Sequence, residues 1–232
     1  MRPLDKAMGR YSIRKFKFRD STFNFDCKFC DEILLEDSFA FGIAREIYIR
    51  DCYFKFLPNN TYEKVRTVVD LGANRGAFSA LMTTKAKFIL SVECGKQYVA
   101  IIQHNLDLNE FVNYEIENIF VGDGGSGESD NLSSQHITMN ELLDKHKLHS
   151  IDLIKMDIEG SEFSLFEKPG WLSRVDALTM EVHPFYGDVN LILNSLKNYN
   201  FEYAMADENL NRRTDLSDMS FIYAWKKRVI RS

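Results

Sequence analysis

The sequence predicts an α/β fold, built on a mostly parallel sheet of seven strands whose last strand is antiparallel, with a small N-terminal cap. Three observations predict it. The 232 residues are 45% apolar and 27% charged, an ordinary globular composition that suffices for one core. Beyond residue 60, apolar runs of strand length alternate with segments of helical periodicity, which calls for a parallel sheet covered on both faces. The last two runs have only a polar segment between them, which favours a hairpin-like return.

The first sixty residues predict a small cap or hairpin laid against the main body. Residues 15–19 alternate, so a strand here would place Phe16 and Phe18 on one face and three cations on the other. Residues 45–54 read as another strand, and the Leu-Pro-Asn-Asn segment at residues 57–60 is typical of a turn or linker. We therefore divide the chain into a cap at residues 1–60 and a main domain at residues 61–232.

The main domain predicts strands and helices in alternation. Residues 98–106 carry apolar side chains at helical spacing, Thr138 and Glu141 match a capping box, and Pro169 ends the helix predicted at residues 160–168. A Gly-rich loop precedes the capping box. The predicted strands are residues 64–70, 87–93, 114–121, 151–157, 175–183, 201–206 and 220–225, and the other helices lie at residues 76–84, after residue 138, and at 191–199.

Charge is distributed unevenly along the chain. The net charge is −5, yet residues 1–20 hold seven basic and two acidic side chains. This basic arm could attract an anion, or it could be a solvated tail on an acidic body; a general nucleic-acid binder is not predicted. No apolar run approaches the ~20 residues of a membrane helix, and the N-terminus does not resemble a secretory signal, so we expect a cytoplasmic protein without a membrane span.

The cysteines do not predict a disulfide framework. Cys27 and Cys30 form a single C-x-x-C, while Cys52 and Cys94 lie in separate segments. Zinc sites usually have a second ligand pair at short spacing, which is missing here. Buried thiols are the favoured interpretation, and no metal is predicted.

The ends of the predicted strands carry the candidate site. Ligands of open parallel sheets bind outside the carboxyl ends of the strands. Gly72 and Gly76 allow a tight turn and a close approach of ligand to backbone. Acidic side chains end several neighbouring strands. The residues at this edge are Asp70, Gly72, Ala73, Asn74 and Gly76 after the first strand of the domain, Glu93 after the second, Asp157 and Glu159 after the fourth, and Glu181 and His183 after the fifth.

The spacing in the first of these segments helps to choose a cofactor. A dinucleotide site normally needs G-x-G-x-x-G, and Asn74 stands where that pattern has its second glycine. An acidic crevice repels a pyrophosphate but accommodates a sulfonium and an ammonium group. This favours S-adenosylmethionine over NAD. An NAD-type oxidoreductase remains the alternative, because a carboxylate such as Glu93 can hold the ribose of either cofactor.

Four segments together resemble one family. VVDLGANRGAFS, LSVE, IDLIKMDIEGSEFSLFE and TMEVHP are similar to the FkbM-type S-adenosylmethionine-dependent methyltransferases, over residues 65–225. REIYIRDCY, just upstream, resembles the segment that leads into the family's domain. The resemblance implies a class I, Rossmann-like methyltransferase domain at residues 61–232 and O-methylation of a small acceptor with a hydroxyl group, such as a sugar or another natural product.

The resemblance also implies roles at the cofactor. Glu93 would bind the ribose, although Cys94 stands where the family usually has proline. The adenine contacts would fall near residues 119–123, Asp123 among them, and substrate choice would lie in residues 1–60. The methionine half would be cradled by Asp70, Gly72, Ala73, Asn74 and Gly76.

Methyl transfer to oxygen also needs a group that takes the hydroxyl proton. We predict His183 as this base, because an ordinary imidazole accepts protons near neutral pH. Asp157 would orient the hydroxyl or the imidazole, and Glu159 is a further catalytic candidate. A divalent cation held by these three residues is a chemical alternative. A non-catalytic binding module that uses the basic arm is the other rival.

Overall fold

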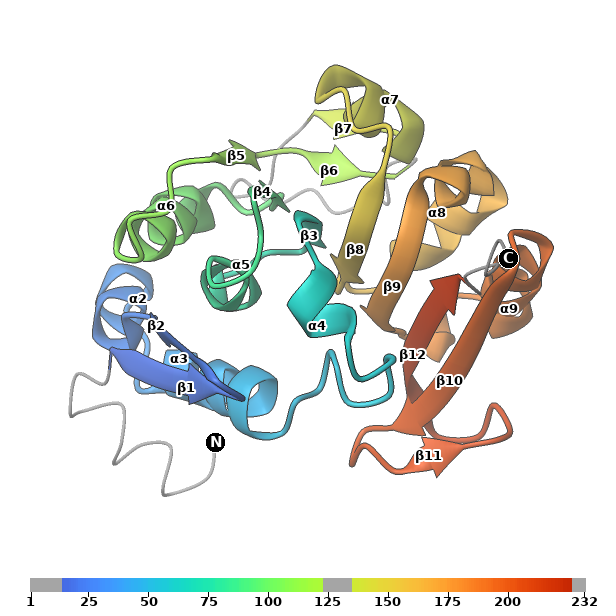
Figure 1. The fold of residues 1–232 in the computed structure, drawn as a ribbon, viewed down its shortest axis with the longest axis horizontal. Helices are drawn as coiled ribbons and strands as arrows, with labels where there is room; N and C mark the ends of the chain where they lie inside the picture. The colour runs from blue at the N-terminus through green and yellow to red at the C-terminus, as the bar shows by residue number, and fades with distance from the viewer. Residues whose placement is uncertain (1–13, 123–134, 227–232) are drawn as a thin grey trace.

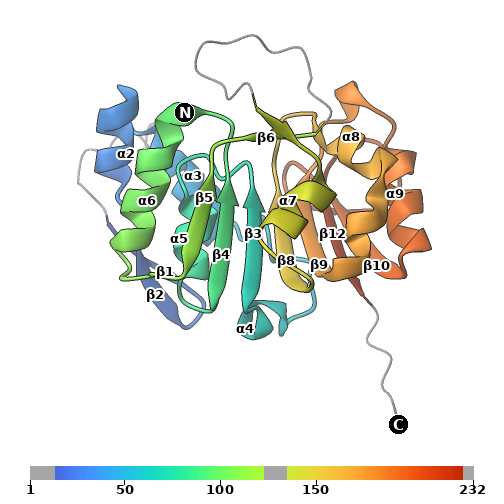
Figure 2. The same ribbon diagram turned by 90° about the horizontal axis from the view of Figure 1, so that it is seen from above.

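The computed structural model describes residues 14–122 and 135–226, and its centre is a sheet of eight strands. The order is β11-β10-β12-β9-β8-β3-β4-β5, which Figure 2 shows as a row from β5 at one edge to β10 near the other. β3, β4, β5, β8 and β9 pair in parallel, and β12 is antiparallel to both β9 and β10. The strands are β3 (Thr67–Leu71), β4 (Phe88–Val92), β5 (Tyr114–Glu117), β8 (Ile151–Met156), β9 (Val175–Glu181), β10 (Phe201–Asp207), β11 (Arg212–Arg213) and β12 (Met219–Lys226).

This arrangement confirms the α/β fold and the antiparallel last strand. All seven predicted strands are present in the sheet, and the two-residue β11 at its edge is the eighth. The polar segment between β10 and β12 forms this added strand. The sequence could not indicate β11, because a strand of two residues has no recognisable pattern.

Helices cover both faces of the sheet (Figure 1). Successive strand residues face opposite sides: Val68 packs into one apolar cluster with α5 and α6, and Val69 into the other with α7, α8 and α9. These five helices are α5 (Ala77–Met82), α6 (Val99–Asp107), α7 (Met139–Lys145), α8 (Glu162–Glu167) and α9 (Val189–Asn198). The predicted capping box is confirmed: the Thr138 hydroxyl accepts from the Glu141 backbone N–H, and the Glu141 carboxylate accepts from the Thr138 N–H. No helix of the described residues is long and apolar enough to cross a membrane.

The N-terminal segment packs on the α5 and α6 side of the sheet (Figure 1). β1 and β2 form an antiparallel hairpin that buries Phe18 and turns Phe16 onto Tyr48, with 5.0 Å between the two ring centroids. Its core side chains belong to the same apolar cluster as those of α5 and α6. The elements of this segment are β1 (Lys15–Phe18), β2 (Ser21–Asn24), α2 (Cys27–Leu34), α3 (Phe39–Ala44), the π-helix η1 (Arg45–Ile49) and α4 (Thr61–Lys64).

The strand predicted at residues 45–54 is wrong. α3 continues directly into the π-helix η1, and residues 50–56 follow as turns. Ala44, Ile47 and Tyr48 are buried whereas Ile49 is 68% exposed, which is a helical spacing and not a strand alternation. The Tyr48 hydroxyl donates to the backbone carbonyl of Ala77 at 2.8 Å, so tertiary packing fixes this turn of helix against α5.

The strand predicted at residues 114–121 is divided in two. β5 ends at Glu117, and β6 (Phe120–Val121) instead pairs in parallel with β7 (His136–Ile137). Asn118 lies at the break, where its side-chain amide donates to the carbonyls of Glu93 and Cys94 at 2.8 and 3.0 Å. The chain therefore leaves the sheet because a side chain there binds the turn that follows β4. Short 3-10 helices complete the fold at η2 (Lys96–Tyr98), η3 (Pro169–Arg174) and η4 (Pro184–Tyr186).

Candidate active site

Two adjoining cavities lie at the carboxyl ends of the parallel strands. The larger cavity has a volume of about 530 Å³ and the smaller cavity about 390 Å³. The larger is bounded by α3, η1 and the ends of β8 and β9; the smaller lies between the ends of β3 and β4 and residues 119–121. The residues that line both are Gly72, Asn74, Asp157 and Glu159. A ligand in one cavity can thus meet a ligand in the other at this junction.

The loop after β3 forms the wall between the cavities, and its backbone requires glycine. Gly72 has φ +71°, and a Cβ there would lie 1.7 Å from the carbonyl oxygen of Asp157. Gly76 has φ +70°, and a Cβ there would lie 3.1 Å from the Cα of Ile102. Both positions lie in the left-handed region, where only glycine is without strain. Ala73 lines the larger cavity between them.

Glu93 is fixed at the end of β4 by backbone donors. Its Oε2 accepts from the Asn74 N–H at 2.8 Å and its Oε1 from the Gly95 N–H at 2.7 Å. The side chain is only 8% exposed and lines the smaller cavity. Cys94 follows in the turn that Asn118 holds, and burial together with the charge of Glu93 raises the pKa of its thiol to about 11. Oε1 also accepts from the Cys94 thiol at 3.6 Å, and Oε2 keeps a lone pair for a ligand.

A buried ion pair supports this loop from inside the sheet. Asp70 is 0% exposed and lines neither cavity; its Oδ1 lies 3.2 Å from Lys155 Nζ, and its Oδ2 accepts from the Ser79 hydroxyl at 2.7 Å. Lys155 donates in turn to the Gly72 carbonyl at 2.7 Å. Burial lowers the pKa of Lys155, but the charges of Asp70 and Asp157 outweigh it, and the pKa lies above its usual value. Lys155 therefore stays cationic and holds the loop.

Arg75 joins this loop to the N-terminal segment, a role that the sequence did not indicate. Its side chain is 1% exposed and pairs with Glu36. The guanidinium also donates to Asn74 Oδ1 at 2.6 Å and lies 4.7 Å from the centroid of the Phe39 ring. The loop and the wall of the larger cavity are thereby linked by one buried cation.

Asp157 and Glu181 end neighbouring strands and both line the larger cavity. The Tyr53 hydroxyl donates to Asp157 Oδ2 at 3.1 Å. Burial, and then the charge of Asp157, raises the pKa of Glu181 to about 7. The sequence places Glu181 at a strand end but predicts His183, two residues later, as the base, because an ordinary imidazole accepts protons near neutral pH. Only burial distinguishes Glu181, and burial was not visible in the sequence.

His183 is held by carboxylates beside the junction. Its Nδ1 lies 3.1 Å from Oε1 of the buried Glu162, and its Nε2 lies 3.4 Å from the exposed Glu159. The hydrogen bond to Glu162 raises the pKa of His183 to about 9, against the opposing effect of burial. At neutral pH the ring is therefore mostly protonated, and it is not among the residues that line the two cavities. The role of His183 as base stays a prediction, which these contacts do not favour.

Two groups of side chains come close enough to consider a metal ion. In the described residues, the ligand atoms of Asp157, Glu159 and His183 lie within 4.8 Å of one another, and so do those of Glu115, Glu117 and His146. In both groups each imidazole nitrogen already lies within ion-pair distance of a carboxylate. We assign neither group to a metal. Neither group contains a cysteine. Burial raises the pKa of the Cys27 and Cys30 thiols, which disfavours the thiolate form that binds metals.

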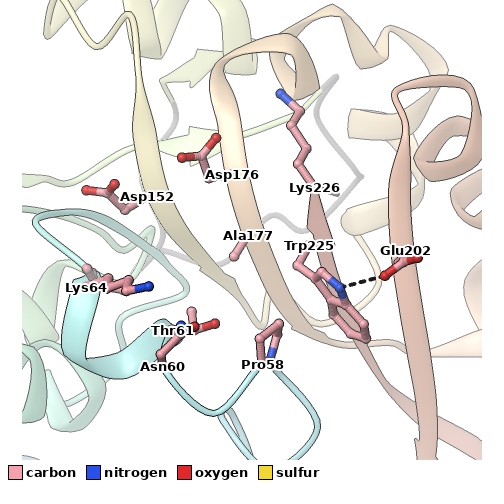
Figure 3. Close-up of a pocket in the computed structure, with 11 residues that line it drawn as sticks. Pro58, Asn60, Thr61, Lys64, Asp152, Asp176, Ala177, Glu202, Trp225 and Lys226 are labelled. Carbon is pink, nitrogen blue, oxygen red and sulfur yellow. Dashed lines mark hydrogen bonds between the residues drawn. The ribbon is translucent and has the colours of Figure 1, made fainter. Parts of the chain in front are cut away.

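A third cavity, of about 280 Å³, lies at the opposite ends of the parallel strands, and Figure 3 shows residues that line it. Lys64, Asp152, Asp176 and Lys226 surround it near the amino ends of β8 and β9. Asp152 accepts from the backbone N–H groups of Arg66 and Thr67 at 2.9 and 2.7 Å, so this carboxylate fastens the start of β3. None of the glycine-loop residues lines this cavity, and we do not assign the site to it.

Three predicted features fall partly or wholly outside the described residues. They are Asp123, the Gly-rich loop that precedes the capping box, and the first thirteen residues of the basic arm. Within the described part of the arm, Arg14 pairs with Asp26 at 2.9 Å and Arg19 with Asp51 at 3.2 Å. These two cations stabilise the cap itself.

The chain is similar to known proteins in sequence and in fold. The model of the methyltransferase FkbM domain matches residues 53–203. No curated protein matches the chain. Among solved structures, an rRNA methylase from Streptococcus thermophilus is 15% identical, with 72% of this chain and 91% of that chain covered and a TM-score of 0.48. Fibrillarin from Aeropyrum pernix, in complex with natively bound S-adenosyl-L-methionine, is 11% identical, with 76% and 73% covered and a TM-score of 0.48.

Proposed function

The chain belongs to the FkbM methyltransferase family, which depends on S-adenosylmethionine, and on that premise we propose that it methylates a hydroxyl oxygen of a small molecule such as a sugar. The observation that carries the proposal is the pair of cavities that meet at Gly72, Asn74, Asp157 and Glu159. One cavity suits the methyl donor and the other an acceptor. Their junction is where the two reacting atoms would be aligned.

The smaller cavity fits the methyl donor by charge and by shape. Its described lining includes three carboxylates, those of Glu93, Asp157 and Glu159, and no lysine or arginine. Such a lining disfavours a pyrophosphate, which argues against the NAD alternative, and accommodates a sulfonium and an ammonium group. Val92, Ile119 and Val121 add an apolar slot for an adenine ring, with further apolar surface from Tyr98 and Phe120.

Within this site we assign the ribose hydroxyls to Glu93 and the methionine half to the loop at residues 72–76. The carboxylate of Glu93 is already oriented by two backbone N–H groups, so its free lone pairs have a fixed direction. Asp70 acts through Lys155 and the Gly72 carbonyl, and is a positioning residue. Bound in this way, S-adenosylmethionine supplies an electrophilic methyl group at the junction.

The larger cavity suits an uncharged or cationic acceptor. Asp157, Glu159, Glu181 and the exposed Glu208 line it, and its cations are engaged elsewhere: Lys155 with Asp70, Arg75 with Glu36, and Arg50 with Glu46. An acceptor with a phosphate would meet these carboxylates. The apolar side of the cavity comes from Phe39, Ile43 and Ile47 of the N-terminal segment, which supports the placement of substrate choice in residues 1–60.

The protein contributes alignment and proton transfer to this reaction. Holding donor and acceptor in line can lower the barrier by several kcal/mol. Asp157, fixed by the Tyr53 hydroxyl, is proposed to orient the acceptor hydroxyl through its free oxygen. Glu159 and His183 remain proposed catalytic residues; a charged His183 would hold Glu159 at the edge of the junction.

Calorimetry tests the cofactor site. We expect S-adenosylhomocysteine to bind the wild type and to bind Glu93→Gln at least tenfold more weakly, because the amide replaces one ribose acceptor by a donor. Glu167→Gln, an exposed glutamate at the end of α8, is the matched control and should bind as the wild type does. Equal affinity in Glu93→Gln would contradict the assignment, and binding of NAD to the wild type would favour the oxidoreductase. Transfer of tritiated methyl to neutral monosaccharides, compared with sugar phosphates, tests the acceptor class.

A further inference from the structure

Glu181 ends β9, a strand that directly adjoins Asp157, and it faces the larger cavity. Met156 and Met180 are register partners of the parallel pair β8 and β9, and Asp157 and Glu181 are the next residues on the two chains. Both carboxylates line the larger cavity, and Asp157 also lines the smaller one. A hydroxyl that Asp157 orients at the junction therefore has Glu181 beside it on the acceptor side.

The carboxylate of Glu181 is without a partner among the described residues. It makes no hydrogen bond or ion pair there, whereas Glu93 accepts two backbone N–H groups and the buried Glu162 accepts from Gly160 and His183. Glu181 is partly buried and lines the larger cavity. Both of its oxygens are thus free to accept a proton from a molecule in that cavity.

The groups around Glu181 keep its pKa near neutral pH. Desolvation raises its pKa, and the charges of Asp157 and Glu159 raise it further, whereas His183 and Lys155 lower it; the result is about 7. From the cap and from β12, Cys52, Tyr53 and Tyr223 also face it, and burial raises the pKa of all three so that they stay neutral. A base with a pKa near the working pH transfers protons most efficiently.

We propose that Glu181 is the catalytic base of this methyltransferase. As the bond forms between the acceptor oxygen and the methyl carbon, the bond from that carbon to sulfur breaks and its electron pair stays on sulfur. The hydroxyl proton passes to the Glu181 carboxylate and then to water, which regenerates the base. The inference rests on the methyl transfer proposed above, and it assigns to Glu181 the role that the sequence predicted for His183.

A direct titration tests the proposal without an acceptor. In protein labelled with ¹³C at the glutamate carboxyl carbons and saturated with S-adenosylhomocysteine, we expect one carboxyl resonance to titrate near pH 7. It should vanish in Glu181→Gln and persist in Asp176→Asn, which neutralises a carboxylate at the other end of the same strand (Figure 3). If the Glu181 resonance titrates below pH 5, the proposal is overturned.

Turnover provides the second measurement, with tritiated S-adenosylmethionine and methyl α-D-mannopyranoside as the hydroxyl probe. The wild-type kcat should rise with pH through an apparent pKa near 7, and Glu181→Gln should lose at least 10²-fold in kcat with an unchanged affinity for S-adenosylhomocysteine. His183→Asn should keep the rise but move it to higher pH, because the charge of His183 lowers the pKa of Glu181. If Glu181→Gln retains the wild-type rate, Glu181 is not the base. If the wild type itself does not methylate the probe, the proposed acceptor class fails, and the titration alone decides the role of Glu181.

Discussion

The two cavities differ in how their carboxylates are held. In the smaller cavity, Glu93 is bound by two backbone N–H groups. In the larger, Glu181 has no partner among the described residues, and Asp157 is held by one tyrosine hydroxyl. Glu93 is oriented before any ligand arrives, whereas Glu181 is a free acceptor that a substrate hydroxyl would satisfy. With the cavities assigned as proposed, this difference means that the protein preorganises the ribose contact and that the acceptor completes its own side of the site.

The difference follows from how each cavity is built. The cofactor side comes from residues 119–121 and from the ends of β3, β4 and β8, which lie close in space because these three strands pair in parallel. The acceptor side combines three distant segments: α3 and η1, the ends of β8 and β9, and the residues after β10. Lys155 belongs to both sides, since it lines the larger cavity and holds the loop of the smaller one.

The largest effect on the free energy of unfolding should come from removing Lys155, the cation that contacts both sides. Lys155→Met leaves Asp70 buried without its charge partner, and breaking a buried pair in this way costs about 3–5 kcal/mol. We expect the free energy of urea unfolding to fall by that amount, and the melting temperature by roughly 10 °C. Lys28→Met, which removes an exposed pair with Glu32, should change the unfolding free energy by less than about 0.5 kcal/mol. Equal losses in both variants would show that the buried pair does not anchor the loop.

The next effect should follow from Gly72→Ala, at the wall that both cavities share. The new Cβ would lie 1.7 Å from the Asp157 carbonyl oxygen, so the loop must shift, and the left-handed backbone alone would cost about 1–3 kcal/mol. We expect affinity for S-adenosylhomocysteine, measured by calorimetry, to fall at least tenfold. Gly42→Ala in α3 has open space around its Cβ and should leave that affinity unchanged, with a slight gain in stability. A Gly72→Ala protein that binds normally would contradict a preshaped cofactor side.

The smallest effect concerns the edge of the acceptor side and depends on pH. Because the folded-state pKa of His183 is raised to about 9 from an ordinary 6.5, its pairing with Glu162 stabilises the fold fully below about pH 6.5 and is lost as pH rises through 9. His183→Asn should therefore lower the unfolding free energy at pH 6, by about 1 kcal/mol, and less at pH 10. Urea unfolding at both values measures the difference. A loss that is equal at both pH values would mean that His183 is neutral in the folded protein.

The cofactor side was largely predictable from the sequence. Gly72, Asn74, Gly76 and Glu93 stand at fixed distances from strand ends, and the structure brings them to the smaller cavity or to the turn beside it. Asp70 was predicted on the same pattern but lies under the loop, because a strand-end residue faces either the crevice or the sheet according to packing. The helical conformation of residues 45–49 was not predicted for a related reason. A short apolar run fits a strand and a helix equally well, and only the packing of the folded chain decides between them.

The chain's local patterns by themselves determined the order of strands and helices in the main domain, the family, the cofactor and the glycine loop after β3, because backbone turns and alternating burial depend on residues close in sequence. Tertiary structure alone decided which side chains of the site are charged and which have no hydrogen-bond partner. The unusual pKa values of Glu181 and His183 arise from burial and from carboxylates on other segments, Asp157 and Glu162. Proton affinity depends on distances in space, which local sequence does not contain.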